Sequence, residues 1–267
     1  QSFDRGGWYV RVKWRRGLRR WSRWSKGVRF FVKSASQSEA VEKYFCSKTI
    51  GGPGTEEWPN LCRTDDGGYL LAAGSDSFGD GDKDLLVIKT DIDGNIEWQN
   101  VYGGPEDDKP GALGKGIIRT DDGNYLISAV TGSWGESGGF NPWLIKIRPD
   151  GSIVWQKWFG NEFSNYHRCI CSEDFAGNII VTTIYQSSED QDSRDIWIIK
   201  LEHDGEKVLW QRTYGGNEGD YPYICVISKA GYYPGDYLIA GFTYSQDIGF
   251  FDPNVSNALF LRISPEK

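Results

Sequence analysis

The feature that most restricts the fold of this chain is a unit repeated four times in tandem. A four-residue segment that ends in glycine or asparagine, called the landmark here, recurs in each unit. It lies at Thr49–Gly52, Val101–Gly104, Trp158–Asn161 and Thr213–Gly216. Successive landmarks are 52, 57 and 55 residues apart, which is close to the length of a four-stranded propeller blade. We therefore predict an all-β fold, a four-bladed β-propeller.

Each unit contains four strand-like runs in the same order. Asp-Gly-Gly or Asp-Gly-Asn turns, which favour hairpins, precede the second run at Tyr69 and Tyr125. The fourth run carries a tryptophan, at Trp98, Trp155 and Trp210 in the first three units. The third run places Lys or Arg five residues after Asp or Asn, in the pairs Asp84 and Lys89, Asn141 and Lys146, Asp195 and Lys200, and Asn257 and Arg262.

The fourth unit has no fourth run after its third strand. An unpaired sheet edge invites aggregation, so another strand should cover it. We expect Tyr44–Ile50 to close the last blade, in its own ring or in a neighbour's. This places the propeller at 44–267, with blades at about 51–100, 103–157, 160–212 and 215–267 plus 44–50.

The repeated strings resemble those of a known group of proteins. They read Trp-Gln-x-x-(Tyr/Phe)-Gly-Gly, Asp-Asp-Gly-(Gly/Asn)-Tyr-Leu and Leu-Ile-Lys-(Ile/Thr)-Asp. They are similar to the tandem repeats of secreted and cell-surface β-propeller proteins of bacteria and archaea, over residues 48–267. The resemblance implies the fold and an extracellular or cell-surface location. It implies no activity, because propellers host enzymes, lectins and scaffolds alike.

The N-terminal arm, residues 1–43, differs in charge from the rest. Residues 1–48 hold 13 Lys and Arg against 3 Asp and Glu, whereas the remainder holds 17 against 34. Alternation at 8–14 and 28–33 predicts a hairpin, and Ser36 with Glu39 predicts the start of a short helix. The arm residues of interest are Trp8, Arg11, Lys13, Trp14, Arg15, Arg16, Arg19, Arg20, Trp21, Arg23 and Trp24.

Three partners suit a basic, tryptophan-rich arm. It can dock on the acidic propeller of its own or a neighbouring subunit, because opposite charges attract. It can bind nucleic acid through phosphate contacts and base stacking over residues 1–33. It can also attach to an anionic surface. No run of apolar residues is long enough for a transmembrane helix.

The loops between second and third strands are the most irregular parts of the repeat, and ligands usually bind on such loops. Carboxylates mixed with aromatic rings there suit a sugar or a protein partner. The ligand-face residues are Asp76, Asp80, Asp82, Trp134, Phe140, Asp190, Asp192, Asp247, Phe250 and Phe251.

Two features of the chain leave alternatives open. Asp80, Asp82 and Asp84 form either a solvated turn or a calcium site, although they lack the complete pattern of an EF-hand loop. Cys62 and Cys225 lie in first strands, where they form either a bridge or buried free thiols. No other cofactor is expected.

The chain shows no catalytic motif. Its two histidines, His167 and His203, have no nucleophile elbow or orienting partner in a recognisable pattern. We therefore predict a non-enzymatic, extracytoplasmic structural or interaction propeller that self-associates or binds a protein partner. Nucleic-acid binding through the arm and carbohydrate binding through the propeller are the alternatives.

Overall fold

The structure is a computed structural model. It describes residues 48–80, 82–111, 116–135, 139–160, 168–187, 194–228, 235–245, 247 and 256–264. All strands lie in one compact unit, residues 54–267. The N-terminal arm, with its expected hairpin and helix, lies outside the described residues, so its partners stay predictions.

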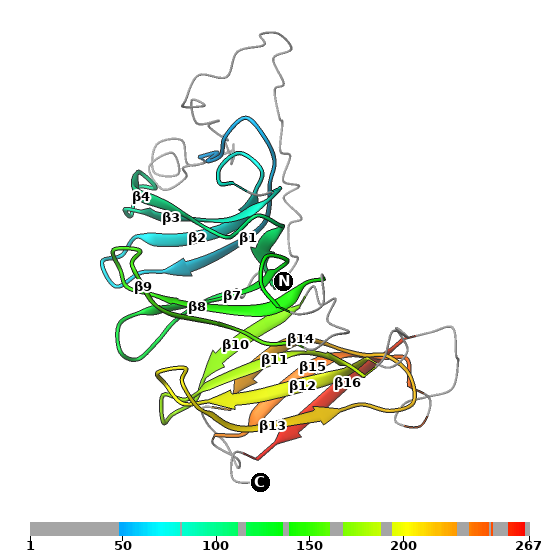
Figure 1. Ribbon diagram of the computed structural model, residues 1–267. Coiled ribbons are helices and arrows are strands. Elements are labelled where there is room, and N and C mark those ends of the chain that lie inside the picture. The colour runs from blue at the N-terminus through cyan, green and yellow to red at the C-terminus, as the bar shows by residue number, and fades with distance from the viewer. Residues whose placement is uncertain are drawn as a thin grey trace, which may run out of the picture. The chain divides into compact units, whose positions relative to one another are not determined.

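Four antiparallel sheets follow one another along the chain, from the blue and cyan first sheet to the orange and red fourth sheet (Figure 1). The first sheet contains β1 (Glu56–Arg63), β2 (Tyr69–Ser75), β3 (Asp84–Thr90) and β4 (Ile96–Tyr102). The second contains β5 (Asp108–Pro110), β6 (Ile117–Arg119), β7 (Tyr125–Thr131), β8 (Asn141–Ile147) and β9 (Ile153–Trp158). The third contains β10 (Cys169–Glu173), β11 (Ile179–Gln186), β12 (Arg194–Leu201) and β13 (Val208–Tyr214). The fourth contains β14 (Asp220–Ile227), β15 (Tyr237–Thr243) and β16 (Asn257–Ile263).

The strands confirm the all-β prediction, because no helix occurs among the described residues. The second, third and fourth runs of the repeat become strands at the expected positions. Glycines in the hairpin turns allow this, as at Gly67 and Gly123, whose φ angles of 86° and 81° are costly for other residues. The turn chemistry of the sequence therefore sets the strand order.

The expected closure of the last sheet stays a prediction. In the described part of the chain the fourth sheet has three strands, in the order β14, β15, β16. Residues 48–50 lie in no strand, and residues 44–47 lie outside the described part.

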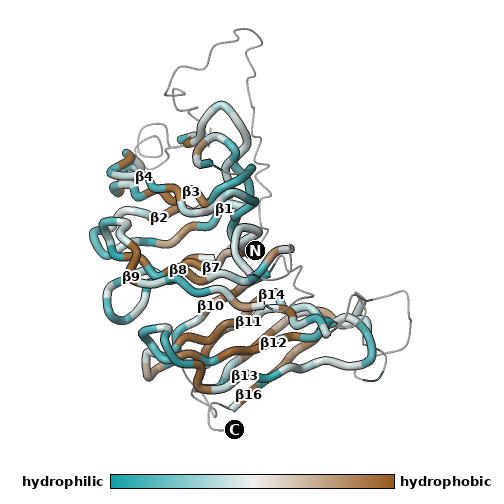
Figure 2. The backbone as a smooth tube through the Cα atoms, in the orientation of Figure 1, coloured by the Kyte–Doolittle hydropathy of each residue, from teal (hydrophilic) through white to brown (hydrophobic). Residues whose placement is uncertain are grey.

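The hydrophobic core lies between successive sheets. On one face of the second sheet, side chains such as Ile127 and Ile145 pack with Leu70 and Val87 of the first sheet. On its opposite face, side chains such as Leu144 pack on the third sheet. Figure 2 shows the hydrophobic residues concentrated in the strands, whereas the connecting loops are mostly hydrophilic. Central strands buried on both faces explain the continuous apolar runs of the repeat.

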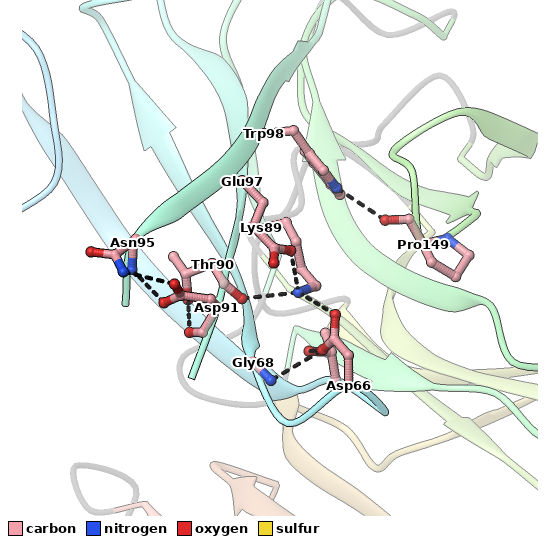
Figure 3. Close-up of polar contacts among 10 residues, drawn as sticks. Asp66, Gly68, Lys89, Thr90, Asp91, Asn95, Glu97, Trp98 and Pro149 are labelled. Carbon is pink, nitrogen blue, oxygen red and sulfur yellow. Dashed lines mark hydrogen bonds and ion pairs between the residues drawn. The ribbon is translucent and has the colours of Figure 1, made fainter. Parts of the chain in front are cut away.

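The Lys or Arg of the third run closes an ion pair with the turn before the second strand. Lys89 Nζ lies 2.7 Å from carboxylate oxygens of both Asp66 and Glu97, and it donates to the carbonyl of Thr90 at 2.9 Å (Figure 3). The hydrogen bond from Lys89 lowers the pKa of Asp66. The equivalent pairs are Lys146 with Asp122 at 2.8 Å, Lys200 with Asp174 at 2.8 Å, and Arg262 with Asp236 at 3.3 Å.

The repeated tryptophan of the fourth run links each sheet to the next. Trp98 Nε1 donates a hydrogen bond of 3.0 Å to the carbonyl of Pro149, in the turn between β8 and β9 (Figure 3). Trp155 lies against Gly205 in the equivalent turn of the third sheet. These contacts fix the end of the sheets that carries the short turns. The opposite end, which carries the loops between second and third strands, is called the loop end below.

Candidate functional site

Four of the predicted ligand-face carboxylates are described, and all four are exposed at the loop end. Asp76 accepts a hydrogen bond from the backbone of Thr55, and Asp247 accepts one of 3.0 Å from Asn217. Asp80 and Asp82 are exposed. Asp190, Asp192, Phe250 and Phe251 lie outside the described residues.

A different set of carboxylates is buried where one sheet meets the next. Asp84 begins β3 and Asp108 begins β5, and both are nearly inaccessible to solvent. A Cβ atom on Gly103 would clash with Asp84 Oδ1 and lie 2.9 Å from Asp108 Oδ2, so the two carboxyl groups flank one glycine. Burial and the charge of Asp84 raise the pKa of Asp108, despite hydrogen bonds to its carboxylate.

The same arrangement recurs between the third and fourth sheets. A Cβ atom on Gly215 would clash with Asp195 Oδ1 and lie 2.8 Å from Asp220 Oδ2. Gly216 and Ser245 donate to Asp220 Oδ2 at 2.8 and 2.9 Å, as Gly104 and Ser133 do to Asp108 at 2.8 and 2.7 Å. Asp108 Oδ1 and Asp220 Oδ1 have no hydrogen-bond partner. These paired carboxylates belong to the repeat and are closed to a substrate.

The expected calcium site is not assembled as a cluster. Asp84 is buried beside Gly79 and Gly103, whereas Asp80 and Asp82 are exposed. No group of three His, Cys, Asp or Glu residues in the described part of the chain is arranged to hold a metal ion. Calcium binding therefore stays a prediction.

Three tryptophans gather at the loop end of the second sheet. Trp134 follows β7, and Trp143 and Trp158 are cross-strand partners in β8 and β9. Trp134 meets Trp143 edge to face at 5.0 Å between ring centroids, and it stacks on Trp158 at 6.0 Å. Trp143 is fully buried, whereas 45% of Trp158 is exposed. We call Trp134 and Trp158 the tryptophan surface, which Trp143 supports from within the core.

The sequence prediction included Trp134 but missed Trp158. The signal was present in the repeat, because Trp158 occupies the position that Val101 and Thr213 hold in the first and third units. Phe140, also predicted, lies apart from the tryptophans under Lys109, whose Nζ is 4.3 Å from the ring centroid. The structure therefore brings together only part of the predicted face.

A second aromatic group missed by the sequence lies on the fourth sheet. Arg168 places its guanidinium 3.9 Å from the ring centroid of Tyr223 and donates to the Tyr223 hydroxyl at 2.8 Å. Tyr221 stacks on Phe242 at 4.8 Å, and Phe242 meets Tyr244 edge to face at 5.5 Å. Pairing between β14 and β15 brings these rings together.

The histidines and cysteines are the remaining candidates. His203 is exposed in a turn, where its carbonyl accepts a hydrogen bond from Lys146, and His167 lies outside the described residues. No disulfide joins Cys62 and Cys225. Burial raises the pKa of Cys171 to about 12, which keeps this thiol protonated.

Comparison with known proteins supports the fold. No protein-family model matches the chain, and no curated protein matches it. A solved structure from Dyadobacter fermentans, described as a protein of unknown function, has a TM-score of 0.54 at 12% identity. The match covers 82% of this chain and 64% of that one, so this chain spans less than two thirds of that structure. The chain has a β-propeller fold.

Other similar structures are named as enzymes. A thermostable family-43 glycoside hydrolase has a TM-score of 0.48 at 10% identity, covering 80% of this chain and 78% of that one. An endo-1,5-α-L-arabinanase from Thermotoga petrophila has a TM-score of 0.44 at 15% identity, covering 78% and 56%. Such distant likeness shows the fold alone.

The prediction of a non-enzymatic structural or interaction propeller is wrong on this comparison. Four of the similar structures are named as a family-43 glycoside hydrolase, a β-xylosidase/α-arabinofuranosidase, an endo-1,5-α-L-arabinanase and an α-L-arabinofuranosidase. The sequence reasoning failed because it required a local motif. Glycoside cleavage depends on two carboxyl groups brought together by the fold, and no fixed spacing marks them in the sequence. Among the described residues, no helix has the length and hydropathy needed to span a membrane.

Proposed function

We propose that this chain is a carbohydrate-active β-propeller that binds a saccharide on the tryptophan surface. The observation that carries the proposal is the stacking of Trp134 on Trp158, with 45% of Trp158 exposed. The flat face of an indole ring suits the apolar C–H face of a sugar ring. Val101 and Thr213 serve the same strand position in other units, so the fold does not require an indole there.

A polar partner lies beside the tryptophans. The backbone N–H of Glu106 donates a hydrogen bond of 3.1 Å to Ser133 Oγ. Ser133 directly precedes Trp134 in the chain. Glu106 itself is exposed. We propose that its carboxylate accepts hydrogen bonds from the hydroxyls of a bound sugar. Asp108 is buried nearby and cannot serve this purpose.

Titration calorimetry against a panel of soluble neutral and acidic polysaccharides tests the proposal. We expect at least one polysaccharide to bind, and Trp158→Ala to weaken binding about tenfold, equivalent to about 1.4 kcal/mol. Phe175→Ala is the matched control, because Phe175 is exposed in the turn between β10 and β11, away from the loop end. Binding that is equal in wild type and Trp158→Ala would refute the proposed surface.

The same preparations should be assayed for release of reducing ends from each polysaccharide that binds. Glu106→Gln removes the exposed carboxylate while keeping its shape. Under the proposal, this variant binds more weakly, and it loses any hydrolysis that uses Glu106.

We further propose an extracellular or cell-surface location, which suits a polymeric substrate and agrees with the resemblance of the repeats.

A further inference from the structure

The two outer sheets of the propeller unit each present a face that is buried in every equivalent sheet. For each sheet, the face toward the following sheet is called forward and the face toward the preceding sheet backward. At each internal junction, a forward face packs on a backward face. The forward face of the fourth sheet and the backward face of the first sheet belong to no such junction among the described residues.

Equivalent positions in the third strands show which residue lies on the vacant forward face of the fourth sheet. Phe260 stands three residues into β16, at the position of Val87 in β3, Leu144 in β8 and Ile198 in β12. Those three side chains are completely buried, whereas 65% of Phe260 is exposed. A large apolar side chain such as that of Phe260 would be unfavourable at this position if the position always faced water. The forward face of the fourth sheet is therefore built as an interface.

The vacant backward face is identified in the same way. Leu61 pairs with Leu71, as Ile117 pairs with Ile127, Cys171 with Val181 and Cys225 with Ile239. Ile117, Cys171 and Cys225 are at most 5% exposed, whereas 56% of Leu61 is exposed. The first sheet therefore presents the complement of what the fourth sheet presents.

The described residues do not pack these two faces on each other. Contacts between sheets run from the first to the second, the second to the third, and the third to the fourth. Within the described part, no strand of the first sheet makes more than a marginal contact with a strand of the fourth. The described residues therefore leave one face of the first sheet and one face of the fourth sheet uncovered.

We propose that a second copy of this chain fills both faces, with the fourth sheet of each copy packing on the first sheet of the other. Two such junctions related by a two-fold axis close a ring of eight sheets, four from each copy, which is within the range of known propellers. Phe242 and Tyr244 extend the apolar forward face at its loop end, and aromatic residues are enriched in interfaces. The proposal is independent of saccharide binding.

Light scattering after size-exclusion chromatography of the full chain tests the proposal. The wild type should have twice the mass of the 30.2 kDa chain, at low and at high salt. Phe260→Asp and Leu61→Asp should each give monomers, because each variant spoils both junctions of a homodimer. Phe175→Asp, which adds a charge at an exposed turn, should remain dimeric.

Mixing the two monomeric variants distinguishes this arrangement from any other. The mixture contains one junction with both native faces, formed by Phe260 of the Leu61→Asp chain and Leu61 of the Phe260→Asp chain. A heterodimer should therefore reappear. Circular dichroism confirms that each variant is folded. The proposal is overturned by a monomeric wild type, by dimers that persist in both aspartate variants, or by folded variants that fail to associate when mixed.

Discussion

At the scale of single residues, the buried carboxylate pairs are the least expected feature. Asp84 with Asp108, and Asp195 with Asp220, place two acidic groups beside one glycine at equivalent junctions. The second sheet has Asn141 at the position of Asp84 and Asp195, so the fold accepts a neutral amide there. Burial raises the pKa of both Asp108 and Asp195, with the neighbouring carboxylate as a further cause. The fold therefore favours a proton on each pair.

Replacing Asp108 with Asn should stabilise the protein at neutral pH. A raised pKa in the folded state means that the stability gained from protonation is complete below the unfolded carboxyl pKa. It is lost as the pH rises through the folded value. Asp108→Asn should therefore raise the free energy of unfolding by roughly 1 kcal/mol at pH 7, and by less at pH 4. Urea denaturation at both pH values measures this effect.

The control for that experiment is Asp80→Asn, which removes the same charge from an exposed position. It should change stability by less than about 0.5 kcal/mol at either pH. Equal destabilisation by Asp108→Asn at pH 7 and pH 4 would show that its hydrogen bonds, rather than its burial beside Asp84, determine its contribution.

At the scale of elements, the contact between a fourth-strand tryptophan and the next turn joins neighbouring sheets. Trp155 lies so close to Gly205 that a Cβ atom there would be 2.7 Å from the indole Cε2. Gly205 also has a φ angle of 75°, a conformation that L-residues rarely adopt. The turn therefore needs glycine for two separate reasons.

Two alanine substitutions separate these reasons. Gly123 has a φ angle of 81°, and a Cβ atom there would meet nothing within 4 Å. Gly123→Ala should therefore cost only the backbone strain, about 1 kcal/mol. Gly205→Ala should cost about 2 to 4 kcal/mol, because it also displaces Trp155. Thermal unfolding of both variants gives the comparison, and equal losses would mean that the tryptophan contact adds nothing.

The strands were predictable from the sequence because the information that sets them is local. Asp-Gly turns set the hairpins, and the position of Trp98 and its equivalents set the end of each unit. The ion pair from Lys89 to Asp66 was not predicted. The repeat shows only the spacing of Lys89 from Asp84, whereas the partner of Lys89 lies in another turn. Repetition made the pattern strong enough to read.

The candidate site was predictable only in part, because its contacts depend on packing between distant segments. Trp134 was identified from its loop, but its stacking on Trp158 depends on the pairing of β8 with β9. Asp84 was expected to lie in either a solvated turn or a calcium site, whereas the fold buries it beside Asp108. The sequence does not show which of its carboxylates are buried. The structure separates the buried carboxylates, such as Asp84 and Asp108, from the exposed ones in the loops.

At the scale of the whole molecule, the central claim is that the propeller unit has two vacant faces. Three internal junctions bury the positions that Leu61 and Phe260 leave exposed. We propose that the four sheets are consecutive sheets of a larger ring. A binding surface at the loop end of the second sheet stays accessible in such a ring, because it lies away from both vacant faces.

Hydrogen exchange followed by mass spectrometry, at low and high protein concentration, tests this claim most directly. Amides in β1 and β16 should exchange more slowly as concentration rises, because association covers the two vacant faces and suppresses local opening. Amides in β7, β8, β11 and β12 should be unaffected. Protection of β1 and β16 that is as strong in the Leu61→Asp variant as in the wild type, at every concentration, would contradict the claim, because both faces would then be covered within one chain.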